Sequence, residues 1–249
     1  MYLWKKGDLY ELSNNISVYN WRYFRILTKL NVKSKKILTV GSSADQALNA
    51  LLLGAKEVTI FDLNEEKEKF YKEKKDIILN SNRTDIYNKI LGLKMFNYFD
   101  DIFSKKDLEK MNLYMNSDEN YRKLQEILVN SNVSFATGNI FDIKNSDLKK
   151  QNFDVILLSN VLQYLEISDD DLVEEKIYEI YLSLNKYLNK DGIIQLYYLY
   201  ASIYPKAFSK IVNYFFTNGI IFNKLECDNS MDSVVLVKKK WRMSFFCLT

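Results

Sequence analysis

Residues 35–64 read KKILTVGSSADQALNALLLGAKEVTIFDLN, and this stretch decides the fold of the chain. The apolar run at 37–40 is typical of a strand that is buried on both faces of a sheet. Gly41 then permits a sharp turn, and the apolar residues that follow recur at helical spacing until Gly54, which stands where a helix C-cap glycine belongs. A second apolar strand occupies 58–61. Strand, glycine turn, helix and strand in this order predict the nucleotide-binding half of a parallel α/β sheet.

Asp62 ends the second predicted strand. It follows Gly41 by about 20 residues, the spacing at which a carboxylate in such a unit accepts hydrogen bonds from both hydroxyls of a ribose. The alternative is an ordinary strand–helix–strand unit in which Asp62 is merely solvated. The first interpretation predicts that Gly41 and Asp62 converge on one adenosine-bearing ligand.

The rest of the chain continues the alternation of strands and helices. Apolar runs at 134–136, 153–159 and 192–200 are predicted strands, and a helical pattern separates the last two. Residues 219–226 and 233–237 follow as a closing antiparallel pair. This order predicts an α/β fold with a mostly parallel sheet that is covered by helices on both faces.

Length and composition fit one enzyme-sized domain. The chain has 249 residues, of which 47% are hydrophobic, enough for a single substantial core. The formal net charge is +3, with both signs spread along the sequence, so a nucleic-acid partner is not indicated. No apolar stretch is long enough to span a membrane, and the first residues lack the apolar core of a signal peptide. The expected location is therefore cytoplasmic.

Histidine is absent from the sequence. Its absence excludes a Ser-His-Asp triad, a histidine general base and histidine metal ligation, which leaves Asp, Glu, Tyr, Lys and the backbone for any chemistry. Cys227 and Cys247 have no metal-like spacing. We therefore expect neither a disulfide framework nor a metal site.

Three further segments frame the predicted sheet. Residues 64–132 begin with a charged helix and contain no convincing strand, which indicates a helical insertion after the second strand. Such an insertion either lies over the carboxyl edge of the sheet as a lid or only buries its own apolar stripe. The aromatic residues of segment 1–34 predict an N-terminal helical cover, which either covers the cofactor or forms a substrate wall, or only packs on the sheet. The basic and aromatic tail, 238–246, could rest on an anionic membrane, although a solvated strand end is the commoner meaning of such a run.

This order of elements resembles the class I S-adenosylmethionine-dependent methyltransferase superfamily, whose Rossmann-like fold has seven strands with the last one inserted antiparallel. The likeness extends from Lys35 to Val237. More narrowly, GSSADQALNALLLGAKEVTIFDLN resembles the opening motif of the branch that contains the betaine-lipid 3-amino-3-carboxypropyl transferases. That branch also tends to have a helical insertion after the second strand. The resemblance implies S-adenosyl-L-methionine as the cofactor.

The resemblance implies that the glycine turn holds the methionine part of the cofactor. Only Gly41 remains of the usual G-x-G-x-G pattern, but the residues after it are small and still permit close approach. Amide groups at the helix start would face the ligand carboxylate. Asp45 could bind the ligand ammonium or, as the preferred alternative, cap the helix. The implied residues of this part are Gly41, Ser42, Ser43, Asp45 and Gln46.

The ends of the second and third strands would hold the adenosine. Asp62 would bind the ribose, and the amide of Asn139 would replace the acid of the family's frequent Gly-Asp pair as the acceptor for the adenine amino group. Asp142 is the alternative acceptor, or it is simply a turn residue. The implied residues next to adenine are Leu63, Asn64, Gly138, Asn139, Ile140 and Phe141, with the last two packing on the purine face.

The fourth strand is followed by SNVLQYL at 159–165, at the edge that in the superfamily faces the sulfonium and the incoming nucleophile. Ser159 would complete the cofactor site. Asn160 and Gln163 could orient a substrate, and Tyr164 could accept a proton or form an aromatic wall for the sulfonium. Apolar residues within the same segment favour the alternative of a helix start that packs on the sheet.

We interpret the chain as an S-adenosylmethionine-dependent transferase that moves a methyl or a 3-amino-3-carboxypropyl group to a small-molecule or lipid-like acceptor. Methyl transfer is the commoner activity on this fold, whereas the opening motif favours aminocarboxypropyl transfer. One alternative is a noncatalytic binding module that keeps the cofactor fold. Another is a nicotinamide-dependent dehydrogenase, which the weak glycine pattern and the antiparallel end strand both disfavour. The sequence identifies neither the acceptor nor the oligomeric state.

Overall fold

The computed structural model describes the chain from residue 25 to residue 238 with several gaps. The predicted N-terminal cover is thus described only from α2 (Arg25–Lys29) onward, where Ile26 and Leu27 are buried. The basic tail beyond residue 238 lies outside the described part. The described residues are 25–41, 43–91, 105–149, 151–158, 161, 173–197, 213–214, 216–218, 220–225 and 233–238.

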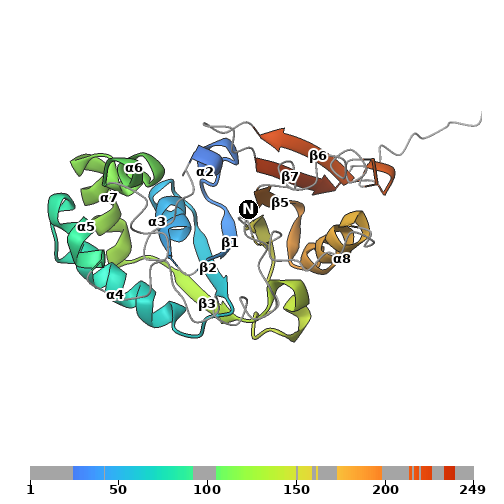
Figure 1. Ribbon diagram of the computed structural model, residues 1–249, viewed down its shortest axis with the longest axis horizontal. Helices are drawn as coiled ribbons and strands as arrows, with labels where there is room; N and C mark the ends of the chain where they lie inside the picture. Colours follow the sequence, from blue (N-terminus) through green and yellow to red (C-terminus); the bar gives the residue numbers. More distant parts are fainter. Residues whose placement is uncertain are drawn as a thin grey trace, which may run out of the picture.

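Seven strands form one sheet in the order β3-β2-β1-β4-β5-β7-β6 (Figure 1). The pairs among β1 to β5 are parallel, whereas β7 is antiparallel to both β5 and β6. This order confirms the predicted fold class, a Rossmann-like sheet with an antiparallel strand inserted near one end. The strands are β1 (Lys36–Val40), β2 (Glu57–Asp62), β3 (Val133–Thr137), β4 (Phe153–Leu157), β5 (Leu188–Tyr197), β6 (Ile220–Leu225) and β7 (Ser233–Lys238).

Burial on both faces of the sheet explains why the central strands are apolar at consecutive positions. Ile37 and Leu38 of β1 are fully buried, and so are Val155 and Ile156, their partners in β4. Consecutive side chains of a strand point to opposite faces of the sheet. A strand whose consecutive residues are all buried therefore requires a cover on each side, as the continuous apolar runs predicted.

β5 begins earlier than the predicted strand at 192–200. It starts at Leu188, which pairs with Phe153, and the register then shifts so that Ile193 pairs with Val155. Polar residues and a glycine lie between the two pairs, so the apolar pattern did not reveal this part of the strand. Residues 198–200 lie outside the described part.

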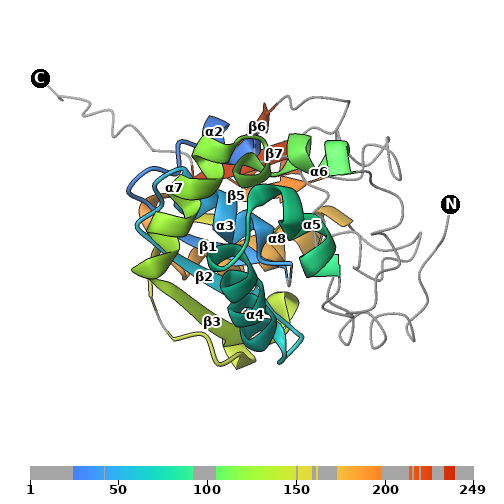
Figure 2. The same cartoon turned by 90° about the vertical axis from the view of Figure 1, so that its left-hand side faces the viewer.

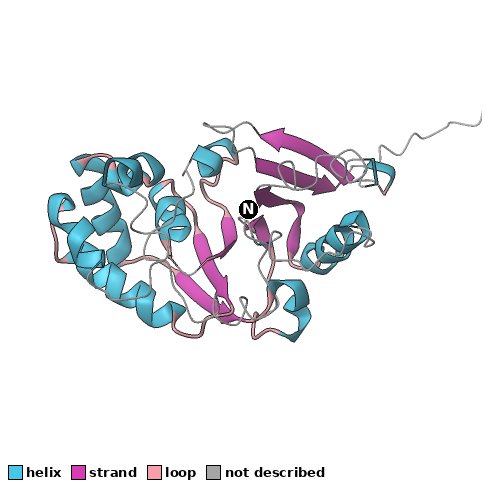
Figure 3. Ribbon diagram, in the orientation of Figure 1, coloured by secondary structure: helices cyan, strands magenta, loops and turns pink. Residues whose placement is uncertain are grey.

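Helices cover both faces of the sheet (Figure 3). One face carries the helices between β1 and β3, and the other carries η2 and α8. No helix in the described part of the chain combines the length and the apolar character that crossing a bilayer requires. The helices are α3 (Asp45–Leu52), α4 (Lys67–Leu79), α5 (Arg83–Leu91), α6 (Lys105–Met111), η1 (Leu113–Met115), α7 (Asp118–Val129), η2 (Ile140–Asn145) and α8 (Val173–Asn185).

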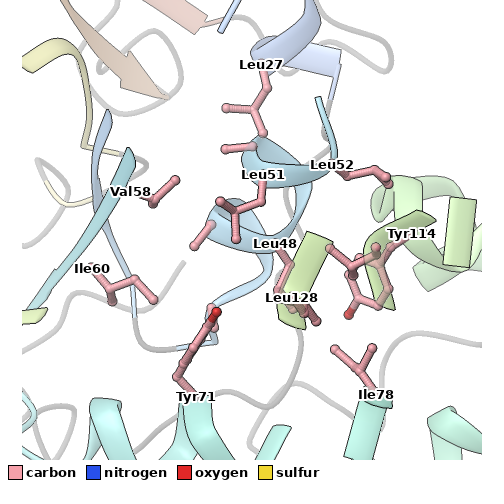
Figure 4. Packing of buried hydrophobic residues seen from close by; sticks show 14 of the residues in the cluster. Leu27, Leu48, Leu51, Leu52, Val58, Ile60, Tyr71, Ile78, Tyr114 and Leu128 are labelled. Atoms are coloured by element: carbon pink, nitrogen blue, oxygen red, sulfur yellow. The ribbon is translucent and has the colours of Figure 1, made fainter. Parts of the chain in front are cut away.

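The insertion is helical in its described part and packs beside α3 on one face of the sheet (Figure 2). Figure 4 shows Leu48 of α3 with Val58 of β2 on one side and Leu128 of α7 on the other. The described part of the insertion therefore buries its apolar stripe against α3. This agrees with the prediction of an insertion that packs on the domain and does not form a lid. Residues 92–104 lie outside the described part, so a lid stays a prediction.

Candidate functional site

The ends of β1 and β2 lie side by side at the carboxyl edge of the sheet. Val40 pairs with Phe61, and the N–H of Gly41 donates to the Phe61 carbonyl over 3.3 Å. Gly41 follows Val40 in the chain and Asp62 follows Phe61. Gly41 and Asp62 are therefore neighbours as well. The glycine turn and the acidic strand end are thus adjacent, and their convergence on one adenosine-bearing ligand stays a prediction.

Gly41 combines a conformation that favours glycine with open space. Its φ is +134°, in the region that L side chains rarely adopt. A Cβ built on Gly41 meets no heavy atom of the described residues within 4 Å. Bare backbone beside open space is what a ligand needs for close approach to a glycine turn. Ser42, the next residue of the predicted site, lies outside the described part.

Asp45 does not cap α3. The residue that precedes the helix is Ala44, which has a left-handed φ of +64° and no side chain able to bond the first N–H groups. Asp45 is instead the first residue of the helix and is fully buried. The cap prediction is wrong because the chain enters the helix one residue earlier than expected.

The Asp45 carboxylate belongs to a buried polar cluster. Its Oδ1 accepts hydrogen bonds from Lys74 Nζ at 2.6 Å and from the Tyr114 hydroxyl at 2.7 Å. The side chains of Asp45 and Lys74 are both 0% exposed. Lys74 Nζ also donates to the Ser43 carbonyl at 2.9 Å. The cluster thus joins the glycine turn to α4 and η1 of the insertion, which argues against the alternative in which Asp45 binds a ligand ammonium.

The other described residues of the turn remain at its surface. Ser43 and Gln46 are half-buried. Ser43 Oγ accepts weakly from the Asp45 N–H at 3.4 Å, and Gln46 Oε1 accepts from the Thr39 hydroxyl at 2.7 Å. The left-handed Ala44 next to a helical residue directs successive N–H groups to a common side, a geometry that suits anions.

Asp62 lies half-buried at the end of β2. Its Oδ1 accepts from the Asn64 N–H at 2.9 Å. Burial raises the pKa of the Asp62 carboxyl, while the N–H groups of Asn64 and Leu63 and the charge of Lys67 oppose the rise. The carboxylate keeps acceptor capacity beyond these bonds to the backbone.

Leu63 and Asn64 have different environments. Leu63 is 47% exposed, so its side chain is accessible next to Asp62. Asn64 is only 7% exposed, and its Oδ1 accepts from the Glu66 N–H at 2.8 Å. The Asn64 side chain therefore bonds the turn that begins α4, and its place next to adenine stays a prediction.

Lys67 is a buried cation close to the same edge. It is 2% exposed, and its Nζ donates to the Asn64 carbonyl at 3.2 Å and to the Thr137 hydroxyl at the end of β3. Burial lowers the pKa of Lys67, and the negative charges of Asp62, Asp147, Glu65 and Glu68 oppose the fall. Lys67 thus connects the end of β2 with the end of β3.

The loop after β3 differs in part from the prediction. A Cβ on Gly138 would lie 2.4 Å from Ser146 Cβ, so Gly138 is needed for packing. Asn139 is exposed, and its Oδ1 accepts from the Phe141 N–H at 3.0 Å, which caps η2. Ile140 is 5% exposed and belongs to the core, whereas Phe141 is half-buried. Of the two residues predicted to pack on the purine, Phe141 is the accessible one.

The structure describes Asp142, the alternative acceptor for the adenine amino group, but not the predicted catalytic residues. Asp142 Oδ2 accepts from Asn145 Nδ2 at 2.6 Å, which fits a turn residue. The chain leaves β4 through the buried Leu158, whose N–H donates to the Gln195 carbonyl at 3.0 Å. The predicted site residues Ser159, Asn160, Gln163 and Tyr164 lie outside the described part. Their roles stay predictions.

Three residues of this edge were missed by the sequence analysis, namely Lys67, Lys74 and Tyr114. The signal for the two lysines was present, because they share the buried face of α4 with Phe70, Tyr71 and Ile78. A lysine on the apolar stripe of an amphipathic helix points inward and needs a partner. No group of three or more potential metal ligands occurs among the described residues.

The strand order with an antiparallel β7, the glycine turn after β1 and the acid at the end of β2 together define a Rossmann-like α/β fold. A scan against protein-family models and a search of curated proteins gave no match.

Solved structures with a similar fold include three methyltransferases. A methyltransferase from Pyrococcus furiosus is 16% identical, and the match covers 87% of this chain and 81% of that one with a TM-score of 0.49. The N-methyltransferase NodS from Bradyrhizobium japonicum WM9, in complex with S-adenosyl-L-homocysteine, is 13% identical, with coverage of 87% and 85% and a TM-score of 0.46. The ribosomal protein L11 methylase from Lactobacillus delbrueckii subsp. bulgaricus is 14% identical, with coverage of 86% and 75% and a TM-score of 0.44. At these TM-scores the fold assignment rests on the strand order of this chain.

Proposed function

We propose that the chain is an S-adenosylmethionine-dependent transferase that moves a methyl or a 3-amino-3-carboxypropyl group to a small-molecule or lipid-like acceptor. The observation that carries the proposal is the adjacency of Gly41, whose Cβ position is free of described neighbours, and Asp62 at the carboxyl edge of the sheet. In open α/β folds, ligands bind at this edge. A glycine turn and an acid so placed suit a ligand that has a ribose and an amino-acid portion.

Each part of the cofactor would have its own contacts. Asp62 would accept hydrogen bonds from the ribose hydroxyls, because a carboxylate has more acceptor sites than its bonds to the N–H groups of Asn64 and Leu63 occupy. The N–H groups after Ala44 would face the ligand carboxylate. Leu63 and Phe141, both accessible, would lie against adenine. Asp45 enters this proposal as a residue that positions the turn, not as a ligand.

The bound cofactor would supply a sulfonium whose attached carbon is already activated for transfer. The electron pair of the acceptor forms a bond to that carbon, the carbon–sulfur bond breaks with its pair going to sulfur, and the acceptor loses its proton. The protein needs only to align the reacting atoms and to take up the proton. We propose Asn160 and Gln163 for alignment and Tyr164 as proton acceptor or aromatic wall, with Ser159 completing the cofactor site.

Which carbon is transferred depends on which carbon–sulfur bond points toward the acceptor. The resemblance of the opening motif to the aminocarboxypropyl branch supports transfer of the larger group, whereas methyl transfer is the commoner activity on the fold. A lipid-like acceptor belongs to the first option. Both options use the same adenosine site.

The by-product distinguishes the options. The purified chain is incubated with S-adenosyl-L-methionine and candidate acceptors, and the nucleoside products are separated by liquid chromatography. S-adenosylhomocysteine indicates methyl transfer, and 5′-methylthioadenosine indicates aminocarboxypropyl transfer. Neither product, together with no thermal shift by the cofactor, would favour a noncatalytic module. Stabilisation by NAD without stabilisation by S-adenosylmethionine would instead favour a dehydrogenase.

A further inference from the structure

Helix α4 carries two buried ammonium groups that reach different parts of the candidate site. Lys67 and Lys74 are seven residues apart, and both side chains are buried. Seven residues correspond to about two helical turns and a rise of about 10 Å, so the two residues share one face of the helix but are well separated along it. One helix thereby contacts two separate backbone segments at the carboxyl edge of the sheet.

Lys74 binds the backbone of the glycine turn. Its Nζ donates to the Ser43 carbonyl at 2.9 Å while it pairs with the Asp45 carboxylate at 2.6 Å. Tyr114 donates to the same carboxylate oxygen at 2.7 Å, which holds Asp45 in place from the side of η1. The conformation of the turn therefore depends on the insertion.

The contact with Ser43 has a consequence for the next amide. In a trans peptide the carbonyl and the following N–H point in opposite directions. Because the Ser43 carbonyl points at the buried Nζ of Lys74, the Ala44 N–H points away from it. The residues that the structure describes provide no acceptor for this N–H. It is thus a donor without an acceptor among the described residues, and it could bind an anion.

Lys67 binds the other part of the site in the same way. Its Nζ donates to the Asn64 carbonyl, directly after β2, and to the Thr137 hydroxyl at the end of β3. Asp62 pairs with Thr137 in the register of β2 and β3. Lys67 therefore holds the end of β3 to the segment that directly follows Asp62, the proposed ribose-binding residue.

We propose that Lys67 and Lys74 are positioning residues that act on separate halves of the ligand: Lys74 sets the glycine turn for the amino-acid portion, and Lys67 sets the ends of β2 and β3 for the adenosine. The inference rests on the proposed function, since it assigns the two halves to an adenosine-bearing amino acid. It adds that α4, the first helix of the insertion after β2, is part of the binding apparatus.

Two ligands separate the two roles. S-adenosylhomocysteine and 5′-methylthioadenosine share the adenosine and the thioether sulfur, but only the first has the amino-acid portion. Their dissociation constants are measured by isothermal titration calorimetry on the full chain and on the variants Lys74→Met and Lys67→Met. We expect Lys74→Met to weaken S-adenosylhomocysteine by about tenfold and to leave 5′-methylthioadenosine within about twofold. Lys67→Met should weaken both ligands by a similar factor, about tenfold.

Matched variants separate positioning from a loss of stability. Asn112→Leu breaks another buried polar contact between α3 and the insertion, the hydrogen bond from Asn49 Nδ2 to Asn112 Oδ1 at 3.0 Å. It should lower the melting temperature and change neither affinity. If Lys74→Met does not fold because Asp45 is left without its cation, the double variant Asp45→Asn/Lys74→Met removes both charges and is expected to show the same selective loss.

The outcomes distinguish the inference from the proposed function. Equal losses for both ligands in the Lys74 variants, or an unchanged ratio of the two affinities, would overturn the inference while leaving the proposed function in place. A wild-type chain that binds neither ligand would overturn the proposed function and, with it, the inference.

Discussion

The two faces of the sheet bury different kinds of side chain. All three charged side chains that are buried in the described part of the chain, those of Asp45, Lys67 and Lys74, lie on the face covered by α3 and α4. The described residues beneath η2 and α8 form an apolar cluster. Burying a charge is costly, so a charge is retained where it does what an apolar side chain cannot do. Here the buried lysines bind backbone carbonyls at the carboxyl edge of the sheet.

The largest expected effect concerns the charged face. Replacing Lys74 by Met leaves the Asp45 carboxylate buried without its cation, and breaking a buried pair in this way typically costs about 3–5 kcal/mol. Urea unfolding followed by circular dichroism measures the loss. The double variant Asp45→Asn/Lys74→Met should recover much of that stability, because no uncompensated charge remains. A loss below about 1 kcal/mol in the single variant would mean that the pair is solvated in solution.

Truncating a side chain on the apolar face should lower the free energy of unfolding and leave ligand affinity unchanged. Ile177 of α8 is 1% exposed, and replacing a buried isoleucine by alanine typically costs about 2–5 kcal/mol. Urea unfolding measures the loss. Because Ile177 belongs to the cluster under α8, its truncation should leave the affinity for 5′-methylthioadenosine unchanged. A loss of affinity equal to that of Lys67→Met would remove the distinction between the two faces.

The strand order was predictable because it depends on local patterns. The apolar runs around Ile37 and Val155 and the glycine turn at Gly41 mark buried parallel strands without any long-range information. The adjacency of Gly41 and Asp62 then follows from the topology of the sheet. What the pattern did not reveal is the polar start of β5 at Leu188, whose pairing depends on a register shift against β4.

The partners of individual polar side chains were less predictable. The contacts of Asp45 come from Lys74 and Tyr114, which lie 29 and 69 residues away in the sequence, so local spacing contains no sign of them. Asn64 and Asn139 illustrate the opposite case. Each accepts a hydrogen bond from the backbone N–H two residues later. Asparagine often forms such local bonds, which compete with ligand binding.

A smaller effect is expected for the ribose-binding carboxylate. Asp62→Ala should weaken 5′-methylthioadenosine by about 1.5–3 kcal/mol, the range for hydrogen bonds to a charged group, which is roughly 10- to 150-fold in the dissociation constant. Calorimetric titration checks it. Asp154→Ala is the matched control, because Asp154 is also half-buried on a strand and accepts from a backbone N–H, that of Lys36 at 2.8 Å, but near the start of β4. An unchanged affinity in Asp62→Ala would remove the ribose assignment.

The smallest expected effect is a shift in the pH at which the affinity for 5′-methylthioadenosine falls by half. This shift should differ between the Lys67 and Lys74 variants. Burial raises the pKa of Asp62. The carboxylate proposed to bind the ribose is therefore protonated at a higher pH than the carboxylate of an ordinary aspartate. Affinity for 5′-methylthioadenosine, which lacks the titrating amino-acid portion, should be full above this raised pKa and fall below it. Since the charge of Lys67 opposes the rise, Lys67→Met should move the midpoint to still higher pH, whereas Lys74→Met should not. Titrations across about pH 4–8 measure the midpoint, and a midpoint that Lys67→Met leaves unmoved would show that this cation does not act on Asp62.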